Sequence, residues 1–119
     1  MIFIVEDDEA TRDSLCLLFE CEGLACRGFA SASAFLAAKP VLDGGCLVLD
    51  VNMAGMDGLA LLERLRASGV TTPAIMITGQ ASPAVLRRAT AAGAVALLEK
   101  PFDSASLVDR VNGLLAHKQ

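Results

Sequence analysis

The feature that most constrains the fold is a regular alternation of short apolar runs with longer amphipathic segments. The short runs have the β-branched and aliphatic composition of strands, and they cover residues 2–5, 24–29, 46–51, 74–78 and 94–98. Each run is followed by a segment whose apolar residues recur at spacings of three and four, as on one face of a helix. Strands and helices in strict turn predict right-handed crossovers and a mostly parallel sheet that is covered on both faces. We therefore expect a doubly wound α/β domain with five strands and five helices.

The sequence also indicates where the helices begin and which strand lies at an edge. Asp57 and Ser82 occupy capping positions, and Pro83 follows Ser82 at the first helical position. The run 24–29 is more polar than the others, so we expect it at an edge of the sheet. The predicted helices cover residues 9–22, 31–38, 58–68, 83–92 and a last segment that carries Leu107 to Leu115.

Size and charge exclude several classes of protein. The 119 residues fit one domain, and 54% hydrophobic against 20% charged residues excludes a disordered chain. The net charge of −4 repels the phosphates of nucleic acid, so we expect no direct nucleic-acid binding. No apolar segment has the length of a membrane-spanning helix, and no basic region precedes the first apolar run. We therefore expect a cytoplasmic domain over residues 1–119 without a signal peptide.

The cysteines do not form a recognisable metal or redox motif. Cys16, Cys21, Cys26 and Cys46 have no CxxC spacing, and the only histidine, His117, is near the end. We predict that they are reduced and mostly buried as small hydrophobic residues.

Polar side chains stand at or just beyond the ends of four of the predicted strands. They are Asp7, Asp8, Asp50, Thr78 and Lys100. Because parallel strands end at the same edge of a sheet, where α/β folds build their sites, we expect these groups to converge. Taken singly, each has a simpler explanation: an Asp caps a helix, a Thr ends a strand, and a Lys is a solvated surface residue.

The types of these residues suggest phosphoryl chemistry. The three consecutive acids Glu6–Asp8 repel one another, and a metal ion would relieve that repulsion. Mg²⁺ prefers oxygen ligands and needs only one to three carboxylates. With a cation and Lys100 nearby, an ionised Asp50 is a usable nucleophile toward phosphorus, and the hydroxyl of Thr78 can hydrogen-bond the phosphoryl oxygens.

The whole chain resembles the receiver domain of bacterial two-component response regulators. The residues around Asp50 and Thr78 resemble those of the subgroup of FixJ-like transcriptional regulators. The motifs that carry the resemblance are Val5-Glu6-Asp7-Asp8, Leu49-Asp50-Val51-Asn52-Met53 with Gly55-Met56-Asp57-Gly58, Ile77-Thr78-Gly79, and Glu99-Lys100-Pro101-Phe102. The resemblance implies the CheY-like strand order 2-1-3-4-5.

The resemblance also implies roles for single residues. Mg²⁺, with Mn²⁺ or Ca²⁺ as substitutes, would be held by Asp7, Asp8, Asp50 and the backbone carbonyl of Asn52. A sensor histidine kinase would donate a phosphoryl group to Asp50, and Thr78 would then move toward that group. The Lys100–Pro101 peptide bond would be cis. The domain would catalyse only its own phosphorylation and dephosphorylation, and would not be an enzyme for a separate substrate.

Two positions depart from the pattern of the family. Ala54 replaces the proline that commonly follows the methionine after the phosphoacceptor. Leu97 replaces the aromatic residue that usually swings inward when the threonine moves. The face formed by the fourth helix, fifth strand and fifth helix would still bind a partner, a downstream output domain or a second copy, but Leu97 cannot swing a large ring.

Three alternatives stay open at this point. A haloacid-dehalogenase-type phosphatase also uses an aspartyl nucleophile, although it places that residue after the first strand and expects D-x-D where this chain has Asp50-Val51-Asn52. A flavin mononucleotide carrier has a similar sheet, but the acids Glu6–Asp8 would repel its phosphate. A receiver-like module that binds partners without phosphorylation is compatible with Leu97.

Overall fold

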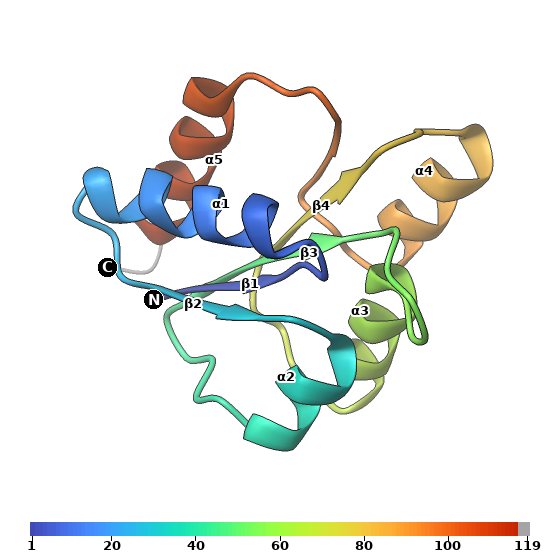
Figure 1. The fold of residues 1–119 in the computed structure, drawn as a ribbon. Helices are drawn as coiled ribbons and strands as arrows, with labels where there is room; N and C mark the ends of the chain where they lie inside the picture. Colours follow the sequence, from blue (N-terminus) through green and yellow to red (C-terminus); the bar gives the residue numbers. More distant parts are fainter. Residues whose placement is uncertain (117–119) are drawn as a thin grey trace.

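The computed structural model describes residues 1–116, which form a five-stranded sheet between two layers of helices (Figure 1). All strand pairs are parallel, and the order is β2-β1-β3-β4-β5. The fold class, the number of elements and the strand order agree with the sequence-based expectation. The elements are β1 (Ile2–Val5), α1 (Glu9–Cys21), β2 (Cys26–Phe29), α2 (Ala32–Ala38), β3 (Cys46–Asp50), α3 (Gly58–Ala67), β4 (Ala74–Thr78), α4 (Pro83–Ala91), β5 (Ala96–Glu99) and α5 (Ser104–Ala116).

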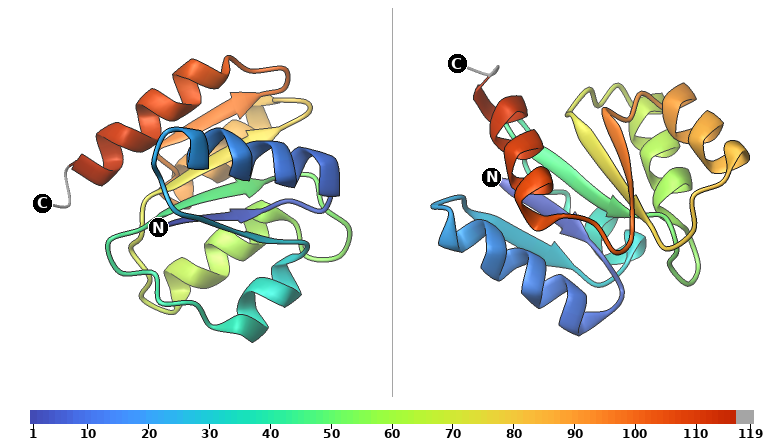
Figure 2. Two further views of the ribbon diagram at one scale, coloured as in Figure 1. Left: turned by 60° about the vertical axis from the view of Figure 1, so that its left-hand side comes forward. Right: turned by 90° about the horizontal axis from the view of Figure 1, so that it is seen from above.

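The sheet separates two apolar cores. Helices α1 and α5 cover one face, and α2, α3 and α4 cover the other (Figure 2). Ile4 of β1 packs on the first side with Phe19 of α1, whereas Val5 packs on the second side with Phe35 of α2. Alternate residues of the central strands therefore enter opposite cores, which is why these strands are apolar throughout.

Side-chain caps fix where the helices begin, as the sequence predicted for Asp57 and Ser82. The Asp57 carboxylate accepts a hydrogen bond from the amide of Ala60, and the Ser82 hydroxyl accepts one from the amide of Val85. Each cap satisfies one of the backbone N–H groups that the first turn of a helix leaves free. The capping residue in each of these two loops thus sets the residue at which the following helix begins.

Strands β2 and β5 begin two residues later than predicted. Leu24 and Ala94 are the first residues of the apolar runs, but the Leu24 amide still donates to the Phe19 carbonyl and the Ala94 amide to the Ala89 carbonyl. These bonds end the preceding helices after a glycine in the left-handed conformation, a common way to close a helix. Helix termination therefore takes precedence over strand propensity at both places.

The prediction that the cysteines are mostly buried was wrong. Only Cys46 is buried; Cys21 is exposed at the end of α1, and Cys16 and Cys26 are half-buried. Cys21 is the last residue of α1, which buries Leu15 and Phe19 instead. None of the four cysteines forms a disulfide, and His117 lies outside the described residues. Within residues 1–116, no helix is both long enough and apolar enough to cross a membrane.

Candidate functional site

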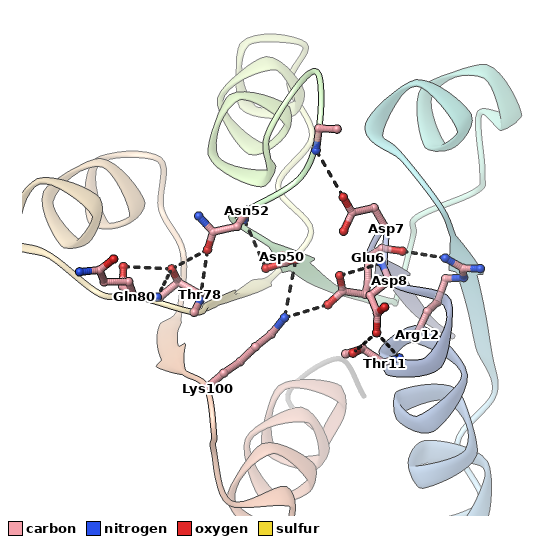
Figure 3. Close-up of polar contacts among 12 residues, drawn as sticks. Glu6, Asp7, Asp8, Thr11, Arg12, Asp50, Asn52, Thr78, Gln80 and Lys100 are labelled. Atoms are coloured by element: carbon pink, nitrogen blue, oxygen red, sulfur yellow. Dashed lines mark hydrogen bonds and ion pairs between the residues drawn. The ribbon is translucent and has the colours of Figure 1, made fainter.

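The polar residues predicted at the strand ends meet at the carboxyl edge of the sheet (Figure 3). Lys100, just after β5, directs its Nζ atom to within 3.1 Å of Glu6 Oε1 and 3.7 Å of Asp50 Oδ2. Glu6 is 2% exposed and Asp50 is 4% exposed, so both carboxylates are buried beside the ammonium group. Residues that are 94 positions apart in sequence thus form one ionic cluster.

A group of three carboxylates lies at this edge, but it differs by one residue from the predicted set. Oxygen atoms of Glu6, Asp7 and Asp50 all lie within 4.8 Å of one another, a spacing suited to a metal ion. The sequence prediction named Asp7, Asp8 and Asp50. Glu6 was missed as a member, and Asp8 lies outside this group.

Asp8 instead caps helix α1. Its carboxylate accepts hydrogen bonds from the amide and the hydroxyl of Thr11, and these bonds lower the pKa of Asp8. The sequence signal for this role was present, because Asp8 stands three residues before Thr11 and directly before the helical segment. The Glu6 amide donates to the Phe29 carbonyl and so continues the pairing of β1 with β2 by one residue. This pairing holds Glu6 at the strand end.

The charges at the site make Asp50 hard to ionise without a cation. Burial, together with hydrogen bonding and repulsion from Glu6, raises the pKa of Asp50 to about 7, against the opposing effects of Lys100 and the Asn52 amide. Burial acts against the charge of Lys100, but its contacts with Glu6 and Asp50 outweigh this and raise the pKa of Lys100. One ammonium group therefore serves two buried carboxylates, and an additional positive charge would favour the ionised form of Asp50.

Thr78 is fully buried at the end of β4, where its hydroxyl is held by neighbouring loops. The single hydroxyl hydrogen is shared between Asn52 Oδ1 at 3.1 Å and the Gln80 carbonyl at 3.2 Å, and the hydroxyl oxygen accepts a bond from the Gln80 amide. The Gly79 amide donates to the same Asn52 oxygen at 3.1 Å. The sequence-based expectation gave Asn52 only a backbone carbonyl that binds the metal ion. It missed the side-chain amide, whose oxygen accepts hydrogen bonds from Thr78 and Gly79.

The remaining predicted positions lie around this centre. The Lys100–Pro101 bond is cis, as the resemblance implied. Leu97 is half-buried and packs against the core on the α4 side of the sheet. The Ala54 amide donates to Asp7 Oδ2 at 3.3 Å, a hydrogen bond that a proline at this position could not make.

A family model described as the response regulator receiver domain matches residues 2–112. The chain belongs to this family. Among curated relatives, it is 42% identical over 114 residues to the transcriptional regulatory protein FixJ of Azorhizobium caulinodans, covering 96% of this chain and 54% of the relative. It is 41% identical over 120 residues to the C4-dicarboxylate transport transcriptional regulatory protein DctR of Rhodobacter capsulatus, covering 98% and 61%.

Solved receiver structures have the same fold. The crystal structure of FixJ-N is 35% identical with a TM-score of 0.87 and covers 98% of this chain and 93% of that one. Full-length FixJ from B. japonicum is 37% identical with a TM-score of 0.88, covering 99% and 58%. The chain thus spans little more than half the length of the FixJ proteins it matches. Family membership makes it a receiver domain of two-component response regulators and leaves the phosphatase and flavin-carrier alternatives without support.

Proposed function

We propose that Asp50 is the phosphoacceptor of this receiver and that a sensor histidine kinase is the donor. The observation that carries the proposal is the burial of Asp50 at the end of β3, with Lys100 Nζ 3.7 Å from its carboxylate and two further acids beside it. Transfer breaks the P–N bond of the phosphohistidine and forms a P–O bond to an Asp50 oxygen. Once a cation keeps Asp50 ionised, its carboxylate at the carboxyl edge of the sheet is suited to this attack.

We infer that Mg²⁺ is held by Glu6, Asp7 and Asp50, with the Asn52 backbone carbonyl as a further ligand. The chemistry of these residues fits the ion, because three clustered carboxylates supply hard oxygen ligands and one ammonium group does not neutralise them. Mn²⁺ or Ca²⁺ would bind to the same ligands. When bound, the ion supplies positive charge that keeps Asp50 ionised and offsets the charge of the phosphoryl oxygens. Asp8, earlier expected as a ligand, is assigned to the helix cap.

Lys100 and Thr78 act on the phosphoryl group in different ways. The Lys100 ammonium, already between Glu6 and Asp50, neutralises charge that develops on the phosphoryl oxygens. The Thr78 hydroxyl must leave Asn52 before it can donate to a phosphoryl oxygen, and its movement would displace residues 79–81. Those residues lead into α4, so the change would reach the face formed by α4, β5 and α5.

The relatives and Leu97 both bear on which partner responds to phosphorylation of this domain. FixJ and DctR are transcriptional regulators that are longer than this chain. We therefore propose that phosphorylation acts on a downstream output domain or on the formation of a homodimer. The net charge of −4 disfavours direct contact of this domain with nucleic acid. A phosphorylation-independent interaction module is the second candidate, favoured by Leu97, which already packs half-buried against the core without a mobile ring.

The test is phosphorylation by acetyl phosphate with Mg²⁺, followed by intact-mass measurement. Wild-type protein should gain the mass of one phosphoryl group, and Asp50→Asn should gain none. Asp57→Asn is a matched control, because Asn also caps a helix well and Asp57 serves the cap of α3; it should be labelled like wild type. Equal labelling of Asp50→Asn and wild type would remove Asp50 from this role, and no labelling of wild type would favour the phosphorylation-independent module.

A further inference from the structure

Two cysteines that have no part in the phosphoryl site lie side by side. Cys16 projects from α1, and Cys26 is the first residue of β2; their sulfur atoms are 2.9 Å apart. Bonded sulfur atoms in a disulfide lie about 2.05 Å apart. A small movement of either side chain therefore brings the pair to bonding distance.

The close approach is built into the packing of α1 on β2. Gly28 lies two residues after Cys26, and a Cβ placed on it would be 3.0 Å from Arg12 Cγ and 3.5 Å from Cys16 Sγ. The absence of a side chain at Gly28 lets α1 lie this close to the strand. The Leu24 amide, which donates to the Phe19 carbonyl, fixes the short connection between the two elements. The pairing of Cys16 with Cys26 thus depends on backbone placement rather than on a single side-chain conformation.

Neither cysteine of the pair is fully buried. Cys16 and Cys26 are half-buried, and β2 is an edge strand that pairs only with β1. The other two cysteines differ from this pair, because Cys21 is exposed at the end of α1 and Cys46 is buried in β3. The chain therefore contains one closely spaced, half-buried pair of thiols and two internal controls.

We propose that Cys16 and Cys26 form a reversible intramolecular disulfide that ties α1 to β2. Disulfides that form in reducing compartments are typically transient and redox-sensing, and a reversible pair fits that class. The oxidant is a low-molecular-weight disulfide such as oxidised glutathione. In the first step one protein sulfur attacks this disulfide as a thiolate, forms a mixed disulfide and releases one glutathione thiol. In the second step the other cysteine loses its proton to solvent, attacks the modified sulfur and releases the second glutathione thiol.

Burial and the neighbouring Cys16 raise the pKa of the Cys26 thiol. Cys26 must therefore lose its proton to solvent before it can attack a disulfide. The closed ring restricts the unfolded chain, so the oxidised protein should melt about 5–10 °C above the reduced protein.

The experiment equilibrates the purified chain with a series of reduced and oxidised glutathione mixtures, then blocks free thiols by alkylation. Trypsin alone leaves Cys16, Cys21 and Cys26 on the single peptide 13–27, but a glutamate-specific protease also cuts after Glu20 and Glu22. The double digest therefore separates the three thiols and identifies the linked pair by mass. Matched variants are Cys16→Ser, Cys26→Ser and, as control, Cys21→Ser.

The expected product is a link between peptides 13–20 and 23–27, with Cys21 and Cys46 alkylated, at a yield independent of protein concentration. Cys21→Ser should keep the link and the rise in melting temperature, whereas Cys16→Ser and Cys26→Ser should lose both. Four alkylated thiols in the wild type at the most oxidising mixture would overturn the proposal, as would a link that involves Cys21 or two chains. Phosphorylation of Asp50 is not measured here, so this result is independent of the proposed function.

Discussion

Asn52 Oδ1 accepts a hydrogen bond from the Thr78 hydroxyl and another from the Gly79 amide, so one side chain holds the end of β4 to the loop after β3. A phosphoryl group on Asp50 would have to compete with Asn52 for the same hydroxyl. The amide of Asn52 therefore acts as a latch on the threonine.

Releasing this latch should favour the phosphorylated conformation. Asn52→Ala removes one hydrogen bond from Thr78, worth about 1 kcal/mol net, which corresponds to about a fivefold change in an equilibrium. We expect about fivefold tighter binding of beryllofluoride, a phosphoryl mimic, in the presence of Mg²⁺, measured by NMR titration. Gln80→Ala is the matched control, because Gln80 contacts Thr78 only through its backbone. Unchanged or weaker binding of beryllofluoride to Asn52→Ala would show that the hydrogen bond from Thr78 to Asn52 does not oppose the phosphorylated conformation.

Asp50 should make the metal-free protein less stable as the pH rises. Its pKa is raised in the folded state from 3.8 to about 7, so the folded protein binds a proton that the unfolded chain has lost. The penalty is absent below about pH 4, grows as the pH rises, and is complete above about pH 7. Asp50→Asn removes it, and should unfold at higher urea than wild type at pH 8, by about 1–3 kcal/mol after screening by water. At pH 4.5 the difference should be much smaller than at pH 8; a constant difference across this range would contradict the assignment.

Glu6 and Asp8 should respond differently to metal. A ligand present at about 100 times its dissociation constant stabilises a folded protein by about 2.7 kcal/mol, which thermal unfolding with and without Mg²⁺ detects. Asp8→Asn preserves an N-cap residue and should keep the Mg²⁺-dependent rise in melting temperature. Glu6→Gln removes one charge of the carboxylate group and should lose most of that rise. The reverse pattern would restore Asp8 as the ligand predicted from sequence.

Gly58 should be indispensable at the start of α3. A Cβ at this position would overlap the Asp50 carbonyl oxygen and lie 2.8 Å from its carbonyl carbon. Gly58→Ala should therefore destabilise the protein by at least about 2 kcal/mol and impair labelling of Asp50, because helix and strand must move apart. Gly113→Ala in α5 is the control, since a Cβ there meets nothing within 4 Å, and it should stabilise by about 0.5–1 kcal/mol. Chemical denaturation of both variants measures the difference.

Periodicity and capping residues were sufficient to predict the fold class and the number of elements, whereas the strand order was predicted from the resemblance to receiver domains. Apolar strands such as Cys46–Asp50 and the caps Asp57 and Ser82 are local signals that tertiary contacts did not override. The starts of β2 and β5 were misplaced because Leu24 and Ala94 close the preceding helices, a backbone arrangement that side-chain type does not reveal.

The site was predictable in its residue types and edge but not in its exact members. Glu6, Asp7 and Asp8 are adjacent acids, and the choice among them depends on whether β1 ends at residue 5 and on which acid caps α1. The side-chain role of Asn52 could not be predicted, because it depends on how two loops from different strands meet. The contact of Cys16 with Cys26 depends in the same way on how α1 packs over Gly28.

The contact of Lys100 with Glu6 joins the end of β5 to the end of β1, with β3 and β4 between them in the sheet. Since β5 is an edge strand paired only with β4, it is a place where the sheet can begin to fray. Each such opening would withdraw the ammonium group from both buried acids at once. A chain still emerging from the ribosome, or one that has lost its last strand, would therefore have Glu6 and Asp50 without the positive charge of Lys100. The complete ionic cluster would form only after all five strands are in place.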